Sequence, residues 1–498
     1  MINSDYLDNL NKAQKEAVLH LDGPLLIVAG AGSGKTKVLT SRIAHIIKEK
    51  KAFPNQILSV TFTNKAAKEM QNRVSKILGS AAIGLSWLGT FHSICAKLLR
   101  KHASAANLNS NFTIIDTDDQ TRLIKNICKA ENIDIKQLAP RFILAIIDRW
   151  KNKGYYPSEV IINKKDIYEK TILPLYKIYQ QKLTDLNSCD FGDLILHTVK
   201  ILENYPDIRQ IYTTNFKYIL VDEYQDTNFI QSKWLNLLSE KTKNLCCVGD
   251  DDQSIYSWRG AEIKNFLEFD QVYENTKVIR LEQNYRSTQN IVNAANSVIN
   301  KNLNKLDKKV WTDNEIGDKI EVNQTITDSE EGRFVASSIF EAKYNLQLRN
   351  DEFAVLYRTN AQSRSIEDAL RRKNIPFQIF GGLSFYQRKE IKDVLAYLRL
   401  IVNPSDEESL KRIINYPPRG IGQTTIEKIQ IFSNENNLTI FDIVENINNS
   451  DININNGTKQ KLFDFVTMIK SFQIANENLN ALEILNEVLK RVGVVNLL

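Results

Sequence analysis

Residues 28–39, VAGAGSGKTKVL, place closely spaced glycines, a lysine and a threonine directly after an apolar run. Gly32 and Gly34 allow a tight turn whose backbone N–H groups point at phosphate oxygens. Lys35 would reach the terminal phosphates, and the Thr36 hydroxyl is a ligand for magnesium. The sequence therefore predicts a nucleotide-binding loop, although an alanine stands where such loops begin with glycine; its residues are Ala29, Gly30, Ala31, Gly32, Ser33, Gly34, Lys35 and Thr36.

Two acidic residues follow another apolar run in YILVDEYQDT, residues 218–227. A nucleotide-hydrolysing site needs a carboxylate for the metal shell and a second one that polarises the attacking water. We expect Asp222, with Thr36, to hold Mg²⁺, and Glu223 to act on the water, with Lys35 on the phosphates. Such acid pairs also cap strands without any ligand, so this prediction depends on the glycine-rich loop earlier in the chain.

A third segment, GDDDQSIYSWRGA (249–261), also follows an apolar run. Gln253 could sense the terminal phosphate and completes the catalytic candidates of this half of the chain. Tyr256, Trp258 and Arg259 put two aromatic rings and a guanidinium within four residues, which suits stacking on unpaired bases. The alternative is that Trp258 belongs to a hydrophobic core; its polar and glycine neighbours favour exposure.

Short apolar runs alternate with helical patterns over much of the chain, and this order predicts an α/β fold with parallel sheets. The expected strands are LLIV (25–28), ILSVTF (57–62), YILV (218–221), LCCV (245–248), VIRL (278–281) and FAVLY (353–357). Residues 103–210 are almost wholly helical in pattern and suggest an insertion. The pattern is helical again from about residue 385.

Composition and charge further limit the class of protein, its partners and its compartment. The 498 residues are 43% hydrophobic, which is enough for several packed domains, and the net charge of +6 mildly favours a polyanionic partner. Five cysteines lack metal-ligand spacing, so we expect a reducing, cytoplasmic compartment. No apolar stretch approaches the roughly 18 residues of a membrane span.

These segments, in this order, resemble the superfamily 1 DNA helicases of the UvrD, Rep and PcrA type. LNKAQKEAV (10–18) is similar to the family's adenine-reading motif, with Gln14 facing the adenine edge. LEQNYRST (281–288) is similar to the start of its second motor domain. The resemblance implies that Tyr285 stacks on adenine and that Arg286 contacts the terminal phosphate, as a fourth catalytic candidate.

Further segments resemble the family's DNA-contacting motifs: TFTNKAAKEM (61–70), GTFHSICAKLL (89–99), DFGDLIL (190–196), VLYRTNAQSR (355–364), FGGLSFYQRKEIKDVLAYLRLI (380–401) and YPPRGIGQTTIEKI (416–429). In one of them Gln387 stands where the family has glutamate. The resemblance implies a set of nucleic-acid-binding residues: Phe62, Thr63, Asn64, Thr90, His92, Phe191, Tyr256, Trp258, Arg259, Asn360, Gly420 and Gly422.

The resemblance implies two RecA-like motor domains of the P-loop NTPase class, each with a helical insertion. The expected division is 1–102 and 211–281 for the first motor domain, 103–210 for its insertion, 282–380 for the second motor domain and 381–498 for the second insertion. ATP and Mg²⁺ would bind between the motors, and the chain would move 3′ to 5′ on single-stranded DNA and open single/double-strand junctions. Repair or replication proteins are possible partners, no membrane is expected, and the oligomeric state is left open.

The family's last two motifs are not found in these 498 residues. We therefore expect an incomplete second motor domain that lacks its C-terminal part, in a fragment of a longer helicase or a shortened gene product. Two functions stay open: a DNA helicase or translocase, and an ATP-gated single-stranded DNA-binding protein that does not unwind. A relative acting on RNA is a third, because stacking and backbone contacts do not reject ribose.

Overall fold

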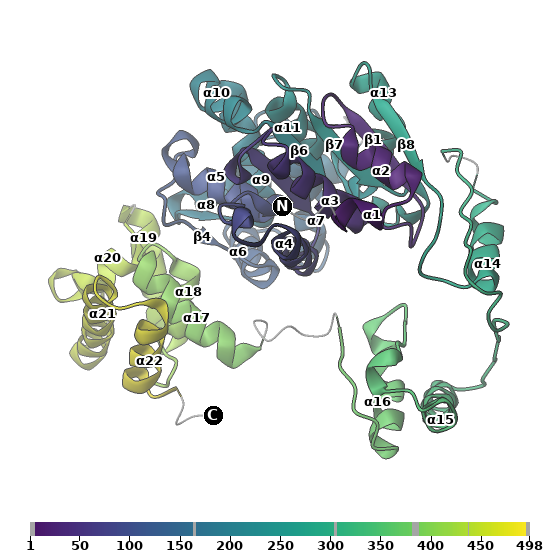
Figure 1. Cartoon of the computed structure of the whole chain (residues 1–498). Coiled ribbons are helices and arrows are strands. Elements are labelled where there is room, and N and C mark those ends of the chain that lie inside the picture. The colour runs from purple at the N-terminus through teal and green to yellow at the C-terminus, as the bar shows by residue number, and fades with distance from the viewer. Residues whose placement is uncertain (1–4, 163–165, 303–305, 381–387, 437, 495–498) are drawn as a thin grey trace.

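The computed structural model describes residues 5–162, 166–302, 306–380, 388–436 and 438–494 (Figure 1). Its largest body is built on a six-stranded parallel sheet in the order β3-β2-β6-β7-β1-β8. The strands are β1 (Leu25–Ala29), β2 (Ile57–Thr61), β3 (Leu88–Thr90), β6 (Tyr218–Val221), β7 (Leu245–Gly249) and β8 (Lys277–Leu281). Five of the six predicted strands are therefore confirmed.

Both faces of the sheet are covered, which explains why its central strands are continuous apolar runs. Leu25 and Ile27 point into the core under α2 (Lys12–Leu19), α3 (Lys35–Lys48) and α4 (Asn64–Leu78). Leu26 and Val28 point into the opposite core, under α5 (Phe91–Lys101), α9 (Phe191–Asn204), α10 (Pro206–Asn215) and α11 (Phe229–Ser239). Three short helices complete this body: α1 (Asp5–Asp8), α12 (Lys264–Leu267) and α13 (Phe269–Val272).

The insertion has a core of its own, formed by α6 (Thr117–Ala130), α7 (Pro140–Asn152) and α8 (Ile167–Asp185). A parallel pair of two-residue strands, β4 (Thr113–Ile114) and β5 (Ser188–Cys189), joins its two ends. Those strands are too short to be recognised from the sequence. Side chains of α9 and α10 pack with the sheet instead, so they belong to the core of the first body.

Residues 282–380 contain α14 (Gln289–Ile299), α15 (Asp328–Leu346) and α16 (Ser363–Arg372). The last two helices pack on each other around Ala336 and Ile366, in a body separate from the sheet (Figure 1). The prediction of a strand at 353–357 is wrong: the segment has no strand assignment, and no described residue of 282–380 forms a named strand. Val355 and Tyr357 pack against the two helices, whereas a strand needs a neighbouring strand to take its backbone hydrogen bonds.

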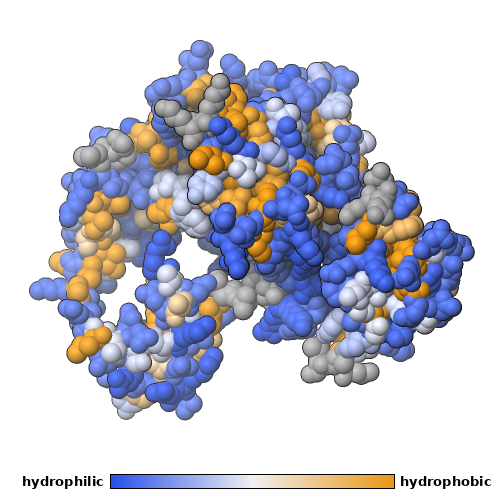
Figure 2. Space-filling view, turned by 180° about the vertical axis from the view of Figure 1, so that it is seen from behind, coloured by the Kyte–Doolittle hydropathy of each residue, from blue (hydrophilic) through white to orange (hydrophobic). Residues whose placement is uncertain are grey.

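The C-terminal body is helical, as predicted. It contains α17 (Lys389–Val402), α18 (Glu407–Ile413), α19 (Gln423–Asn436), α20 (Ile440–Glu445), α21 (Asn456–Asn476) and α22 (Ala481–Val492) around one core. Figure 2 shows hydrophilic residues over much of one face of the molecule, with apolar residues gathered in patches on each body. Among the described residues, no helix is long and apolar enough to cross a membrane.

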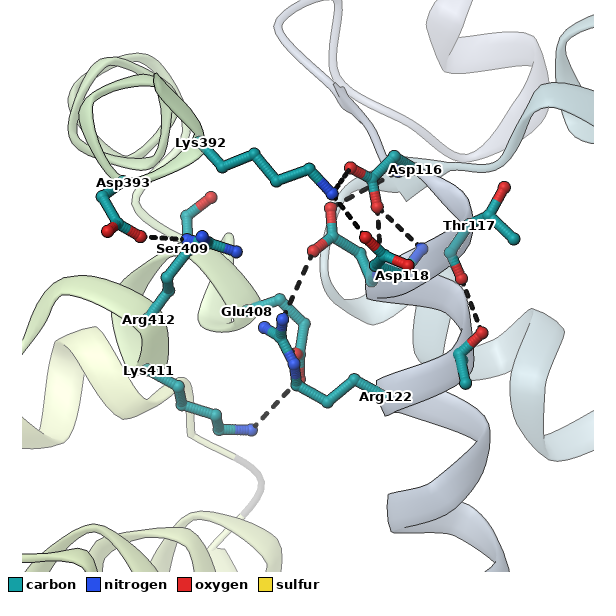
Figure 3. A network of polar contacts seen from close by, with 12 residues as sticks. Asp116, Thr117, Asp118, Arg122, Lys392, Asp393, Glu408, Ser409, Lys411 and Arg412 are labelled. Carbon is teal, nitrogen blue, oxygen red and sulfur yellow. Dashed lines mark hydrogen bonds and ion pairs between the residues drawn. The ribbon is translucent and has the colours of Figure 1, made fainter. Parts of the chain in front are cut away.

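The C-terminal body meets the insertion through charged side chains on α6, α17 and α18 (Figure 3). The Lys392 ammonium lies 2.8 Å from the Asp116 carboxylate and 2.6 Å from that of Asp118. The other two ion pairs are Arg399–Asp119 and Arg122–Glu408, each at 3.2 Å. We call these seven residues the outer joint: Asp116, Asp118, Asp119, Arg122, Lys392, Arg399 and Glu408.

Candidate functional site

The glycine-rich loop connects β1 to α3 at the carboxyl edge of the sheet. Gly32 and Gly34 have φ angles of +70° and +88°, in the left-handed region that glycine adopts without strain. The Ser33 hydroxyl donates a 2.7 Å hydrogen bond to the Gly30 carbonyl and braces the turn. Lys35 and Thr36 then open α3, where the helix N-terminus favours an anion.

The acidic segment follows β6 at the same edge of the sheet. The Lys35 ammonium lies 3.2 Å from the Glu223 carboxylate, so the structure brings together the two halves of the predicted site. Glu223 has a φ angle of +52°, which is uncommon for a residue with a Cβ and typically costs about 1 kcal/mol or more. Held strain of this kind is typical of functional positions.

Carboxylate charge is in excess beside this lysine. Burial, and then the charge of Glu223, raise the pKa of Asp222 to about 7, against the opposing effect of Lys35. The same causes raise the pKa of Asp226 to about 6, and its Oδ1 atom is buried with no hydrogen-bond partner among the described residues. Together with the Thr36 hydroxyl, these oxygens fit the ligand preference of Mg²⁺, whose charge would stabilise the ionised carboxylates.

Gln253 ends the 3₁₀ turn η5 (Asp251–Gln253), directly beyond β7. Its Nε2 donates to Asp250 Oδ2 at 2.5 Å. Gln225, which the sequence analysis did not single out, links the two acidic segments: its Nε2 donates to Glu223 Oε2 at 2.9 Å, and its Oε1 accepts from the Asp250 backbone N–H at 3.0 Å. A continuous set of polar contacts thus runs from Lys35 to Gln253.

Gln14 is buried, and its amide is already engaged: Nε2 donates to the Ser33 carbonyl at 2.8 Å, and Oε1 accepts from the Asn11 backbone N–H at 3.1 Å. The Asn11 side chain donates to the Tyr285 hydroxyl at 2.8 Å. The two residues predicted to hold adenine therefore lie on either side of Asn11. Reading of the base by Gln14 stays a prediction and would require it to exchange these bonds.

The segment around Arg286 lies directly on the glycine-rich loop. Asn284 Nδ2 donates to the Ala31 carbonyl at 2.7 Å, and the Tyr285 N–H donates to the Gly32 carbonyl at 3.0 Å. A Cβ added to Gly32 would lie 2.9 Å from the Arg286 Cβ. Asn284 was missed because an asparagine that holds a distant loop looks like an ordinary polar residue in the sequence.

Several of the predicted DNA contacts gather at the ends of β2, β3 and β5. The rings of His92 and Phe191 lie 5.9 Å apart, and the Phe191 side chain is exposed. Phe62 is partly buried against Phe91. Thr63 and Thr90 cap α4 and α5 by accepting backbone N–H groups, and Asn64 is the exposed first residue of α4.

Tyr256, Trp258 and Arg259 form an exposed stack. Trp258 is 70% exposed, so the alternative that it belongs to a core is wrong. The Arg259 guanidinium lies 4.6 Å from the centre of the Trp258 ring and 5.0 Å from that of Tyr256. Such a cluster could stack on bases and attract a phosphate backbone.

The structure does not bring the remaining predicted DNA contacts to this surface. Asn360 lies before α16, and Gly420 and Gly422 lie before α19, in two bodies apart from the sheet (Figure 1). Gly420 has a φ angle of +70°, as a tight turn into a helix requires. Gln387 lies outside the described residues.

Comparison with known proteins agrees with this arrangement. The model of the UvrD/REP helicase N-terminal domain matches residues 10–274, and that of the UvrD-like helicase C-terminal domain matches residues 279–456. Similar proteins include the ATP-dependent DNA helicase PcrA of Staphylococcus epidermidis, 46% identical over 97% of this chain and 66% of the relative. The PcrA protein of Staphylococcus aureus is 44% identical over 98% of this chain and 66% of the relative.

The chain belongs to the UvrD/REP helicase family. Its fold is α/β with a parallel sheet, consistent with two RecA-like helicase domains. The expectation of a missing C-terminal part is not supported, since the C-terminal model matches residues 279–456. The chain spans 66% of the length of the curated relatives that it matches.

Proposed function

We propose that the chain is an ATP-dependent DNA helicase that hydrolyses ATP while moving 3′ to 5′ on single-stranded DNA. The observation that carries the proposal is the 3.2 Å contact between Lys35 and Glu223, with the segment of Arg286 bound to the same loop. The phosphates of a nucleotide bound at this loop would contact groups from both the N-terminal and the C-terminal helicase domain of the family. The relatives named ATP-dependent DNA helicase PcrA support the same activity.

Each candidate residue has a chemical task in hydrolysis. Thr36 and Asp222 would hold Mg²⁺, which supplies positive charge to the phosphate oxygens. Lys35 binds the terminal phosphates and thereby leaves its contact with Glu223. Glu223 is then available to take a proton from the attacking water, while Arg286, with Gln253, stabilises the charge that develops on the transferred phosphoryl group.

The DNA strand would stack on exposed rings beside this site. Trp258 and Phe191 offer such rings, and Arg259 adds a positive charge to the backbone contact. Contacts of this kind carry little sequence preference, and their affinity falls with salt. We place the activity in DNA repair or replication, at single/double-strand junctions, and in the cytoplasm, where five free buried cysteines would stay reduced.

The decisive experiment is the steady-state ATPase rate with and without single-stranded DNA, for the wild type, Lys35→Ala, Glu223→Gln and the control Lys37→Ala. Lys37 lies on the same helix and donates to the Asn9 carbonyl, so this control removes an equal charge beside the loop. We expect DNA to stimulate the wild type and the control only. RNA of the same sequence and duplexes with a 3′ or a 5′ tail test the substrate and the direction.

Two results would contradict the proposal. Nucleotide and DNA binding without stimulated hydrolysis would identify an ATP-gated DNA-binding protein. Equal stimulation by RNA and DNA would remove the assignment of DNA as the substrate.

A further inference from the structure

A short segment after α14 crosses the glycine-rich loop. We call residues 306–312 the strap. At one end, the Leu306 N–H donates to Asp251 Oδ2 at 2.7 Å. At the other, the Trp311 N–H donates to the Glu282 carbonyl at 3.0 Å, and the Trp311 carbonyl accepts from the Asn284 N–H at 2.7 Å. The strap is thereby tied both to η5 and to the segment that carries Arg286.

The middle of the strap touches the loop itself. A Cβ added to Gly30 would lie 2.5 Å from Val310 Cγ2, so the strap or the loop would have to shift to admit it. The Asn296 side chain on α14 donates to the Val310 carbonyl at 2.7 Å and holds this part of the strap in place relative to α14. A displacement of the strap would therefore change the contact between Val310 and Gly30.

Lys308 anchors the strap in a cluster of three aspartates. Its ammonium lies 2.9 Å from Asp250 Oδ1 and 2.5 Å from carboxylate oxygens of Asp251 and Asp252. The Lys308 side chain is only 2% exposed. Within the described part of the chain these aspartates form the one cluster of three acidic, histidine or cysteine side chains whose ligand atoms lie close enough together to hold a metal ion, and the ammonium occupies it.

Asp250 connects this anchor to the candidate nucleotide site. One of its carboxylate oxygens accepts from Lys308 and the other from Gln253. Its backbone N–H donates to Gln225, which donates to Glu223, the partner of Lys35. The path from the strap to the phosphate-binding lysine is thus made of direct polar contacts at every step.

We propose that Lys308 is a positioning residue that couples the strap, and the Arg286 segment tied to it, to the nucleotide site; this rests on the proposed function. Without the ammonium, three close carboxylates would repel one another in a place with little solvent. The turn η5 would then shift, so that Gln253 and Gln225 lose their alignment. Lys308 itself touches neither the loop nor the candidate catalytic groups, so it acts through Asp250.

The test compares Lys308→Met, which keeps the aliphatic stem and removes the charge, with Lys308→Arg and the control Lys309→Met, all in the full chain. Lys309 is exposed, and its backbone N–H contact with Glu282 survives the substitution. We expect Lys308→Met to lower DNA-stimulated kcat about tenfold, with nucleotide affinity changed by less than about threefold. Lys308→Arg should restore most of kcat, and the control should match the wild type.

Hydrogen–deuterium exchange gives a readout that needs no activity. Amides of residues 250–253 and 306–312 should exchange faster in Lys308→Met than in Lys309→Met, with and without ATP. Equal exchange and equal kcat in the two variants would overturn the coupling. A wild type that hydrolyses no ATP would instead overturn the proposed function, and the exchange comparison would still decide the role of Lys308. Thermal unfolding of each variant distinguishes lost coupling from lost folding.

Discussion

Two joints connect the first body and its insertion to later parts of the chain, and both are built on lysine or arginine against carboxylates. The strap lies on the first body, and the outer joint lies on the insertion. At the strap, Lys308 is 2% exposed among its three aspartates. At the outer joint, the exposed fraction of the side chains ranges from 5% for Glu408 to 67% for Asp118. Charges that are removed from water interact several times more strongly than charges that water and salt screen.

The comparison teaches that the same pairing chemistry can serve two purposes. Lys308 is the single cation among three buried aspartates, so its loss would leave their charges uncompensated, and the strap joint therefore fixes positions. The outer joint consists of separate ion pairs, each with at least one solvent-accessible member that water and ions can replace, so it should open at a lower cost. The two joints should therefore respond differently to substitution and to salt.

The largest difference between the two joints is expected in the rate of ATP hydrolysis. Glu223→Gln removes the candidate base on the path from the strap, and the ATPase rate should fall by about 10²- to 10⁴-fold, while binding of a fluorescent ATP analogue persists. Arg399→Gln in the outer joint should leave the rate within about twofold. A similar loss in both variants would mean that the outer joint also serves catalysis.

The two joints should differ next in how much each contributes to the free energy of unfolding. Asp250→Ala removes the acceptor that Lys308 and Gln253 share and should lower the free energy of unfolding by about 1–3 kcal/mol. The matched change Asp118→Ala at the outer joint should cost less than about 1 kcal/mol. Urea unfolding followed by tryptophan fluorescence measures both; equal costs would show that exposure does not govern these pairs.

A buried amide beside the outer joint, on the residue that follows α17, should give an intermediate effect. The Asn403 amide is buried and donates to Thr113 Oγ1 at 3.0 Å and to the Asn187 carbonyl at 3.2 Å. Asn403→Ala should weaken the joint by about 1–2 kcal/mol at any salt concentration. Faster hydrogen–deuterium exchange of the amides of residues 113–119 in Asn403→Ala would report opening of the joint. Exchange equal to that of the wild type would show that the ion pairs alone hold the joint.

The smallest effect is expected from screening of the ion pairs of the outer joint by salt. Raising NaCl from about 0.1 to 0.5 M shortens the screening length from about 10 Å to roughly 4 Å. The radius of gyration from small-angle X-ray scattering should rise, and Lys392→Gln with Arg399→Gln should reproduce that rise at low salt. Exchange of residues 306–312 should stay constant throughout; faster exchange there would erase the distinction between the joints.

The first body could be predicted because its inner strands are buried, largely apolar runs and its motifs lie where those strands end. The sequence 353–357 is equally apolar, yet it forms no strand, because strand formation depends on a partner that local sequence does not specify. The meeting of Lys35 with Glu223 followed from parallel strands sharing one edge. The polar neighbours of Trp258 likewise indicated its exposure correctly.

The place of Lys308 could not be predicted. It lies in a run of charged residues, LDKK, which looks like an ordinary solvated segment. Its partners lie more than fifty residues earlier, and only the path of the chain after α14 brings them to the ammonium. Contacts such as this and that of Asn284 are set by tertiary structure, which overrides the local character of the segment.

Strand β8 gives the molecule a mechanical property. It lies at the edge of the sheet, pairs with the neighbouring strand β1 from Leu25↔Lys277 to Ala29↔Leu281, and leads directly into the segment of Arg286. A pull on the later domains along the strand axis loads all of these backbone hydrogen bonds in shear, so they must break together and not one after another. If the chain moves on DNA as proposed, tension from a blocked DNA end would thus reach the strand before the glycine-rich loop without first unravelling the sheet.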